Sequence, residues 1–239
     1  VVVVEIIPEI VEAARYFDAY NRYLLDDTRA RIEVADASRY LRSAVGEPYD
    51  VVISDLFVPW HSRTGYLYTV EHFEAVKARL EPRGIFAVWV SLREVGAREF
   101  RLIADSLSSV FPVVSVWRDR AHPRKICLVG GAHSLLLDPD EIGKRMAIIQ
   151  GGQDGDSKAF SSWADLEAAY LGLWSSPADN LLNTRDRPRV EHWAPMTERS
   201  GQRRGKEWLD ELHKELFQPL ARPGLHQDSS THRTPGDDN

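Results

Sequence analysis

Residues 49–68, YDVVISDLFVPWHSRTGYLY, decide the fold class of this chain. Val51, Val52 and Ile53 form a short apolar run, which is typical of a parallel strand covered on both faces. Asp55 follows this strand directly. Ligands of open α/β sheets bind outside the carboxyl ends of the strands, where a carboxylate can orient or deprotonate an amine. A carboxylate that only ends the strand and begins a turn fits the same position, so both interpretations stay open.

Strands and helices alternate through the first 131 residues. Apolar runs predict strands at residues 1–6, 31–35, 49–54, 85–90, 113–117 and 125–129. Apolar residues at helical spacing predict helices at residues 8–17, 38–45, 69–80 and 97–111. Thr69 is the expected cap of the third helix. The alternation predicts a mostly parallel sheet, and the short turn before residue 125 favours a closing antiparallel pair.

The composition changes after Gly131, and residues 132–221 are expected to form a carboxyl-terminal helical extension of the 1–131 domain. Within it the sequence predicts helices at residues 138–149, 162–174 and 206–217, with residues 177–195 mostly in loops. Residues 222–239 are polar and rich in Pro, Gly, Ser and Asp, which predicts a disordered tail.

The bulk composition excludes several classes of function. The chain has 239 residues, of which 43% are hydrophobic and 28% charged, an ordinary composition for a domain with an apolar core. A formal net charge of -6 argues against nucleic acid as the main partner. No apolar run approaches the ~18 residues that span a bilayer. The eight histidines show no metal-binding spacing, so no metal is expected.

Two further features concern the compartment and the extent of the chain. The single cysteine, Cys127, lies in an apolar run and is expected to be a core thiol. One cysteine forms no internal disulfide, which fits a reducing, cytoplasmic compartment. No signal peptide is visible, and the sequence begins at Val1 inside an apolar run, as a piece of a longer protein would.

Three segments together resemble the spermidine/spermine synthases, the polyamine aminopropyltransferases. They are VVVVEIIPEIVEAARYF (residues 1–17), RIEVADASRYL (31–41) and YDVVISDLFVPWHSRTGYLYTVEHFEAVKARLEPRGIFAVWV (49–90). The stretch NTRDRPRVEHWAP (183–195) is similar to the carboxyl-terminal part of bacterial spermidine synthase-like proteins. The resemblance implies an α/β fold of the Rossmann-like, class I S-adenosylmethionine-dependent methyltransferase type, here lacking its first strand.

The resemblance also implies the reaction and the nucleoside site. Members of the family transfer an aminopropyl group from decarboxylated S-adenosylmethionine, a co-substrate rather than a tightly bound cofactor, to a small-molecule amine. Glu5, with Ile6 beside it, matches the acidic position that binds the ribose. Asp36 and Ala37 match the pair that reads the adenine, where the carboxylate accepts from the exocyclic amine.

The amine site follows from the central stretch. Asp55 matches the family's carboxylate beside the reaction centre, which orients the attacking amine and helps to remove its proton. Tyr66 and Tyr68 are candidates for lining the amine pocket with ring and hydroxyl. Packing at the start of the following helix is an equally good interpretation of both tyrosines.

The sequence departs from the family in two places. Val58 stands where a second carboxylate usually grips the diamine, and the glycine-rich first strand of the family has no counterpart. Two alternatives therefore stay open: a methyltransferase that uses intact S-adenosylmethionine, and a non-catalytic nucleoside- or polyamine-binding module of a membrane protein. Some similar bacterial proteins carry an amino-terminal membrane region, and polyamine synthases are often dimers or tetramers, so a membrane anchor and a homo-oligomer are both compatible with the resemblance.

Overall fold

A computed structural model describes residues 1–43, 46–55, 58–59, 61, 64–133, 138–151, 162–176, 181–199 and 210. The first part of the chain contains β1 (Val2–Glu5), α1 (Pro8–Ala13), two short 3-10 helices η1 (Ala14–Phe17) and η2 (Leu24–Asp26), α2 (Asp18–Asn21), β2 (Arg31–Val34) and α3 (Ala37–Ser43). The second part contains β3 (Tyr49–Ser54), η3 (Gly65–Tyr68), α4 (Val70–Lys77), β4 (Leu80–Ser91), α5 (Ala97–Val110), β5 (Val113–Arg118) and β6 (Lys125–Gly131). These elements confirm the predicted order of strands and helices.

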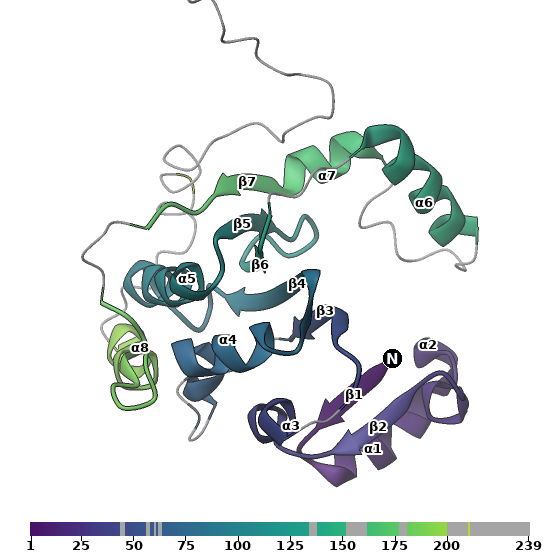
Figure 1. Cartoon of the computed structure of the whole chain (residues 1–239), viewed down its shortest axis with the longest axis horizontal. Helices are drawn as coiled ribbons and strands as arrows, with labels where there is room; N and C mark the ends of the chain where they lie inside the picture. The colour runs from purple at the N-terminus through teal and green to yellow at the C-terminus, as the bar shows by residue number, and fades with distance from the viewer. Residues whose placement is uncertain are drawn as a thin grey trace, which may run out of the picture.

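The strands form two separate sheets (Figure 1). β1 pairs with β2 in parallel, while the larger sheet has the order β3-β4-β6-β5-β7. β3 and β4 are parallel, and β6 pairs antiparallel with both β4 and β5, which confirms the closing antiparallel pair. Within the described residues neither β1 nor β3 has a strand on its second edge. The alternation of elements predicted one mostly parallel sheet. The structure has two sheets instead, and the larger one is mixed, because among its described strands only β3 and β4 pair in parallel and its other pairs are antiparallel.

The exposed edge of β3 corrects one expectation from the sequence. The apolar run of β3 was expected to be covered on both faces, yet Val51 is 48% and Ile53 66% exposed. β1 is likewise only half-buried along its length. The hydrophobic side chains predict the strand itself. Whether both of its faces are buried depends on the neighbouring elements, and β3 lies at the edge of its sheet.

The apolar core lies between the larger sheet and helices α4 and α5. β4 alternates buried and half-buried residues, so Phe86, Val88 and Val90 point to the helices. Phe73 of α4 contacts Phe86, whose ring in turn stacks on Phe111 after α5. Burial of such rings is the main stabilising contribution of this core. Cys127 is also buried, as predicted.

The chain after Gly131 contains α6 (Pro139–Gly151), α7 (Trp163–Ala169), β7 (Tyr170–Leu173) and α8 (Arg189–Arg199). α6 agrees with its predicted helix. The helix predicted for residues 162–174 is wrong in its second half, because β7 pairs there with the edge of β5. The loop predicted for residues 177–195 is wrong from Arg189 onward, since α8 begins there and buries Val190 and Ala194. The helix expected at residues 206–217, apart from residue 210, and the expected tail at 222–239 lie outside the described residues.

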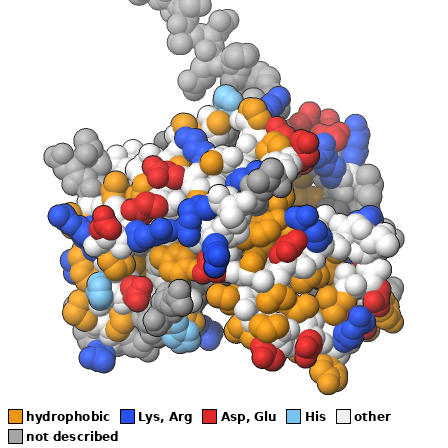
Figure 2. All heavy atoms as spheres, turned by 60° about the horizontal axis from the view of Figure 1, so that its bottom comes forward, with side chains coloured by type: hydrophobic (Ala, Val, Ile, Leu, Met, Phe, Trp, Pro, Cys, Tyr) orange, Lys and Arg blue, Asp and Glu red, His pale blue; other side chains and the backbone are white. Residues whose placement is uncertain are grey.

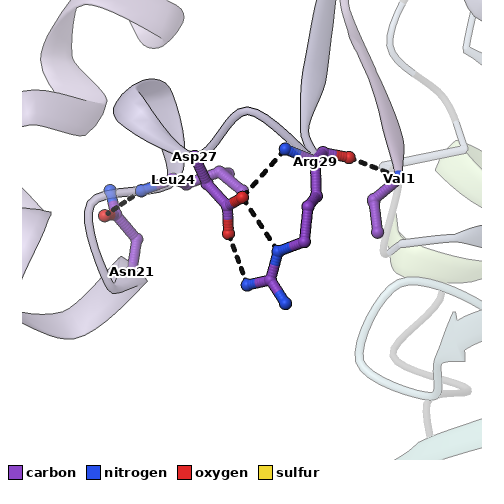
Figure 3. Close-up of polar contacts among 5 residues, drawn as sticks. All are labelled: Val1, Asn21, Leu24, Asp27 and Arg29. Carbon is purple, nitrogen blue, oxygen red and sulfur yellow. Dashed lines mark hydrogen bonds and ion pairs between the residues drawn. The ribbon is translucent and has the colours of Figure 1, made fainter.

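Hydrogen bonds among five residues fix the turn that leads into β2 (Figure 3). The backbone N–H and the guanidinium of Arg29 donate to the carboxylate of Asp27 at 2.7–3.0 Å. The amino group of Val1 donates to the carbonyl of Arg29 at 2.7 Å, and the Leu24 N–H donates to Asn21 Oδ1. This turn places β2 beside β1 with their carboxyl ends level.

A broad apolar surface lies over the segment from β1 to β2. Hydrophobic side chains gather on one side of the molecule in Figure 2, and Ile6, Ile10, Phe17 and Val34 are each more than half exposed. Among the described residues, no helix has both the length and the apolar character needed to cross a membrane.

Thr69 begins α4 as predicted, and its loss should destabilise the protein measurably. Its hydroxyl accepts from the N–H of His72 at 3.4 Å and donates to the carbonyl of Tyr66 at 2.7 Å, in a fully buried position. Replacing Thr69 by Ala should lower the free energy of unfolding by about 1–2 kcal/mol, the usual effect of losing a helix cap. Urea denaturation measures this change. Thr28→Ala, at an exposed turn residue, is the control, and equal stability of the two variants would contradict the capping role.

Candidate functional site

Two of the predicted site residues, Glu5 and Asp36, lie at the carboxyl ends of the paired strands β1 and β2. Glu5 is the last residue of β1 and is opposite Val34, the last residue of β2. The Ala35 N–H donates to the carbonyl of Glu5 at 2.9 Å, which fixes the chain just before Asp36. Parallel pairing therefore brings the predicted ribose and adenine positions to one edge of the β1–β2 sheet.

Glu5 and Ile6 form the turn from β1 into α1. One carboxylate oxygen of Glu5, Oε1, accepts from the N–H of Ile7 at 2.8 Å, which holds the side chain over the turn. Within the described part of the chain no hydrogen bond reaches the second oxygen, so it has acceptor capacity for a hydroxyl group. Ile6 is mostly exposed and lies next to this carboxylate in the chain.

Asp36 directly precedes α3 and connects this edge to Tyr66 of η3. Its Oδ1 accepts from the N–H of Arg39 at 2.8 Å, as in a helix cap, and its Oδ2 accepts from the hydroxyl of Tyr66. Partial burial alone would raise the pKa of Asp36. The hydrogen bonds from Tyr66 and Arg39, with the charge of Arg42, outweigh burial and lower that pKa. Asp36 is therefore an ionised acceptor at neutral pH. Ala37, the first residue of α3, follows it directly.

The two tyrosines of η3 have different surroundings. Tyr66 reaches Asp36 and lines a cavity, whereas Tyr68 is 1% exposed and belongs to the apolar core. The hydroxyl of Tyr68 donates to the carbonyl of Trp89 at 3.3 Å, near the carboxyl end of β4. The structure thus joins Tyr66 to Asp36 and places Tyr68 in the apolar core.

Asp55 follows β3 directly and is exposed. It lies at the carboxyl end of its strand, as Glu5 and Asp36 do, but its strand belongs to the other sheet. Val58, at the place of the family's second carboxylate, is partly buried. Among the described residues, no group of three or more His, Cys, Asp or Glu side chains is arranged to hold a metal ion.

Residues that the sequence did not indicate complete the surroundings of Asp36. A cavity of about 360 Å³ is lined by Asp36, Arg39, Arg42, Tyr66 and Arg185. Arg185 comes from the loop before α8, and its N–H donates to Glu71 Oε2 at 2.9 Å. The only sequence signal for it was the arginine-rich run RDRPR, residues 185–189.

Removing the Tyr66 hydroxyl tests its coupling to Asp36. In Tyr66→Phe the pKa of Asp36 should rise toward its ordinary value of about 3.9, because one bond to the ionised form is lost. A carboxylate with a lowered pKa stabilises the fold above its unfolded pKa, and this contribution disappears as the pH falls through the folded pKa. The variant should therefore lose less stability than the wild type on acidification from pH 5.

Carboxyl carbon NMR of Asp36 across an acid titration gives the pKa directly. Tyr20→Phe, in which an exposed ring loses the same hydroxyl, is the control. An unchanged Asp36 pKa in Tyr66→Phe would contradict the assigned hydrogen bond.

Comparison with known proteins shows what the first half of the chain is similar to. Residues 1–118 match the spermine/spermidine synthase domain. The polyamine aminopropyltransferase of Thermotoga neapolitana is 31% identical over 108 residues, which are 45% of this chain and 36% of that protein. The polyamine aminopropyltransferase 1 of Hyperthermus butylicus is 32% identical over 114 residues, 46% of this chain and 39% of that protein. The matches thus span well under half the length of these relatives.

A solved structure shows the same fold. The spermidine synthase of Thermotoga maritima superposes with a TM-score of 0.54 at 20% sequence identity, over 71% of this chain and 56% of that one. This likeness confirms the predicted Rossmann-like, methyltransferase-type α/β fold. Residues 1–118 of this chain thus match the spermine/spermidine synthase domain, and distant polyamine aminopropyltransferase homologues match about half of the chain.

Proposed function

We propose that this chain is the nucleoside-binding part of a spermidine synthase-like aminopropyltransferase, which moves an aminopropyl group from decarboxylated S-adenosylmethionine to a (poly)amine. One observation carries the proposal: Glu5 ends β1 and Asp36 follows the end of β2 at the same edge of this parallel pair, and a hydrogen bond from Tyr66 helps to lower the pKa of the Asp36 carboxyl. In an open α/β sheet this edge is where nucleosides bind. The match of residues 1–118 to the spermine/spermidine synthase domain supports this class of reaction.

Each carboxylate has a separate role in this proposal. Glu5 accepts from the ribose hydroxyls through its second oxygen, and Asp36 accepts from the exocyclic amine of adenine. Asp55 orients the attacking amine and takes its proton. Ile6 and Ala37 contact the nucleoside beside these groups, while Tyr66 and Tyr68 shape the adjoining surface.

The reaction is a nucleophilic substitution at carbon. The lone pair of a neutral amine forms a new C–N bond to the aminopropyl carbon next to the sulfonium. The C–S bond breaks, its electron pair stays on sulfur, and methylthioadenosine leaves. The proton lost by the new ammonium group passes to Asp55 or to solvent. Because the leaving group departs without protonation, alignment of the two reactants is the main task of the protein.

Methyl transfer from intact S-adenosylmethionine is the second candidate, and two observations favour it. Val58 supplies no charge at the position where the family grips a diamine. The cavity beside Asp36 is lined by three arginines, which repel a polyamine cation. A methyl acceptor need not be a cation.

Product analysis separates the two reactions. The protein is incubated with decarboxylated S-adenosylmethionine and putrescine, and release of methylthioadenosine is followed by chromatography. A parallel incubation uses intact S-adenosylmethionine and follows S-adenosylhomocysteine. Methylthioadenosine that forms only with the diamine present supports aminopropyl transfer, whereas S-adenosylhomocysteine as the sole product supports the methyltransferase.

A further inference from the structure

The cavity beside Asp36 is lined by three arginines that have no role in the proposed aminopropyl transfer. We call it the arginine pocket; its lining residues are Asp36, Arg39, Arg42, Tyr66 and Arg185. Arg39 and Arg42 come from α3, Tyr66 from η3, and Arg185 from the loop before α8. Two segments far apart in the sequence, α3 and the loop before α8, therefore contribute arginines to one cavity. Its volume of about 360 Å³ is in the range of small-molecule sites.

The charges of the arginine pocket are not balanced. Asp36 is its one carboxylate, and both oxygens of Asp36 already accept hydrogen bonds, from Tyr66 and from the Arg39 N–H. Arg42 donates to the neutral hydroxyl of Ser38 at 2.6 Å. Within the described ranges no ion pair holds Arg39, Arg42 or Arg185. Three guanidinium groups against one carboxylate leave the lining with an excess of positive charge.

A buried histidine, His72, interacts electrostatically with Arg42, Arg185 and Asp36 of the pocket lining. His72 is 1% exposed, and in the described structure neither ring nitrogen has a hydrogen-bond partner. Burial and the charges of Arg42 and Arg185 lower the pKa of His72 to about 4, although Asp36 opposes them. His72 is therefore neutral at physiological pH and adds no positive charge beside the arginines.

We infer that the arginine pocket binds the phosphate group of a small phosphorylated ligand. Guanidinium groups present planar pairs of N–H donors that match phosphate oxygens, and clusters of them favour a dianion over a neutral or cationic group. The cavity has room for more than a free phosphate ion, which favours a phosphate ester. Decarboxylated S-adenosylmethionine and polyamines carry no phosphate, so this site goes beyond the proposed function and does not depend on it.

Calorimetric titration at constant ionic strength tests this site on the whole chain. The probes are inorganic phosphate, adenosine 5′-monophosphate and adenosine, which is the same nucleoside without the phosphate group. Adenosine 5′-monophosphate should bind at least tenfold more tightly than adenosine. Comparison with inorganic phosphate tells whether the pocket recognises the ester or the free ion. Equal binding of the nucleotide and adenosine, together with no binding of inorganic phosphate, would overturn the inference.

Variants locate the binding. Arg42→Gln and Arg185→Gln should each weaken phosphate binding about tenfold, since each removes a charged donor pair. Arg83→Gln, an exposed arginine at the start of β4, is the matched control and should bind as the wild type does. Far-ultraviolet circular dichroism checks that each variant is folded, and Arg42→Lys and Arg185→Lys, which keep the charge, should retain intermediate affinity. Full phosphate binding by a folded Arg42→Gln/Arg185→Gln double variant would refute the assignment.

Discussion

Replacing Asp55 by Asn should lower kcat for aminopropyl transfer by about 10²–10⁴-fold, the usual effect of removing a positioned proton acceptor. Affinity for decarboxylated S-adenosylmethionine should stay within about tenfold, because in the proposed mechanism Asp55 acts on the amine, whereas Glu5 and Asp36 hold the nucleoside. Steady-state release of methylthioadenosine measures the first quantity, and calorimetry the second. The asparagine keeps the shape of the side chain and removes only its charge and basicity.

The same strand supplies the control. Asp50 is exposed near the opposite, amino-terminal end of β3, so Asp50→Asn makes the same chemical change away from the binding edge. Its turnover should equal that of the wild type. Undiminished turnover in Asp55→Asn would remove Asp55 from the mechanism, and an equal loss in both variants would point to a general effect on β3.

Replacing Asn183 by Ala should lower the free energy of unfolding by about 3 kcal/mol, the largest effect on stability that we expect from a polar residue here. Asn183 is fully buried. Its Nδ2 donates to the carbonyl of Tyr68 at 2.9 Å, and its Oδ1 accepts from the N–H of Val190 at 3.1 Å. Alanine would leave both backbone groups buried without their partners, and each such group costs about 1–3 kcal/mol.

Asn183 also joins segments through its backbone, which the substitution leaves in place. Its N–H donates to Ser106 Oγ at 2.8 Å, and its carbonyl accepts from the N–H of Val70. Leu181→Ala, at an exposed position two residues earlier, is the control and should change stability little. Chemical denaturation measures both variants. A loss in Asn183→Ala no larger than that in Leu181→Ala would contradict the anchoring role.

The sequence predicted α4 well because the signals for this helix are local. Thr69 has the hydroxyl that a helix cap needs, and Phe73 and Val76 lie one turn apart on the buried face. Neither signal depends on the rest of the chain. The strands β1 to β6 were predicted for the same reason, as short apolar runs bounded by turn residues.

The strand β7 was missed because a long-range contact decides it. The run from Trp163 continues a helical pattern, but β7 pairs with the edge of β5 from Tyr170 onward. Gly172 has a φ of 141°, a conformation that a helix does not contain. A glycine within a predicted helix was the available warning.

The candidate site was predicted in part. The family motifs pointed to Glu5, Asp36 and Asp55, and parallel pairing brings the first two together. The bond between Tyr66 and Asp36 joins residues from different motifs, and Arg185 reaches the same cavity from a distant loop. Such neighbours depend on how α3, η3 and the loop before α8 pack, which no local pattern encodes.

The most direct test of the central claim compares two nucleosides in calorimetric titrations of this chain. Decarboxylated S-adenosylmethionine and intact S-adenosylmethionine differ only in one carboxylate, and they are the donors of aminopropyl and methyl transfer, respectively. Aminopropyl transfer predicts that the decarboxylated form binds at least tenfold more tightly, and that Asp36→Asn weakens this binding. Tighter binding of the intact form, or binding that Asp36→Asn leaves unchanged, would contradict the account.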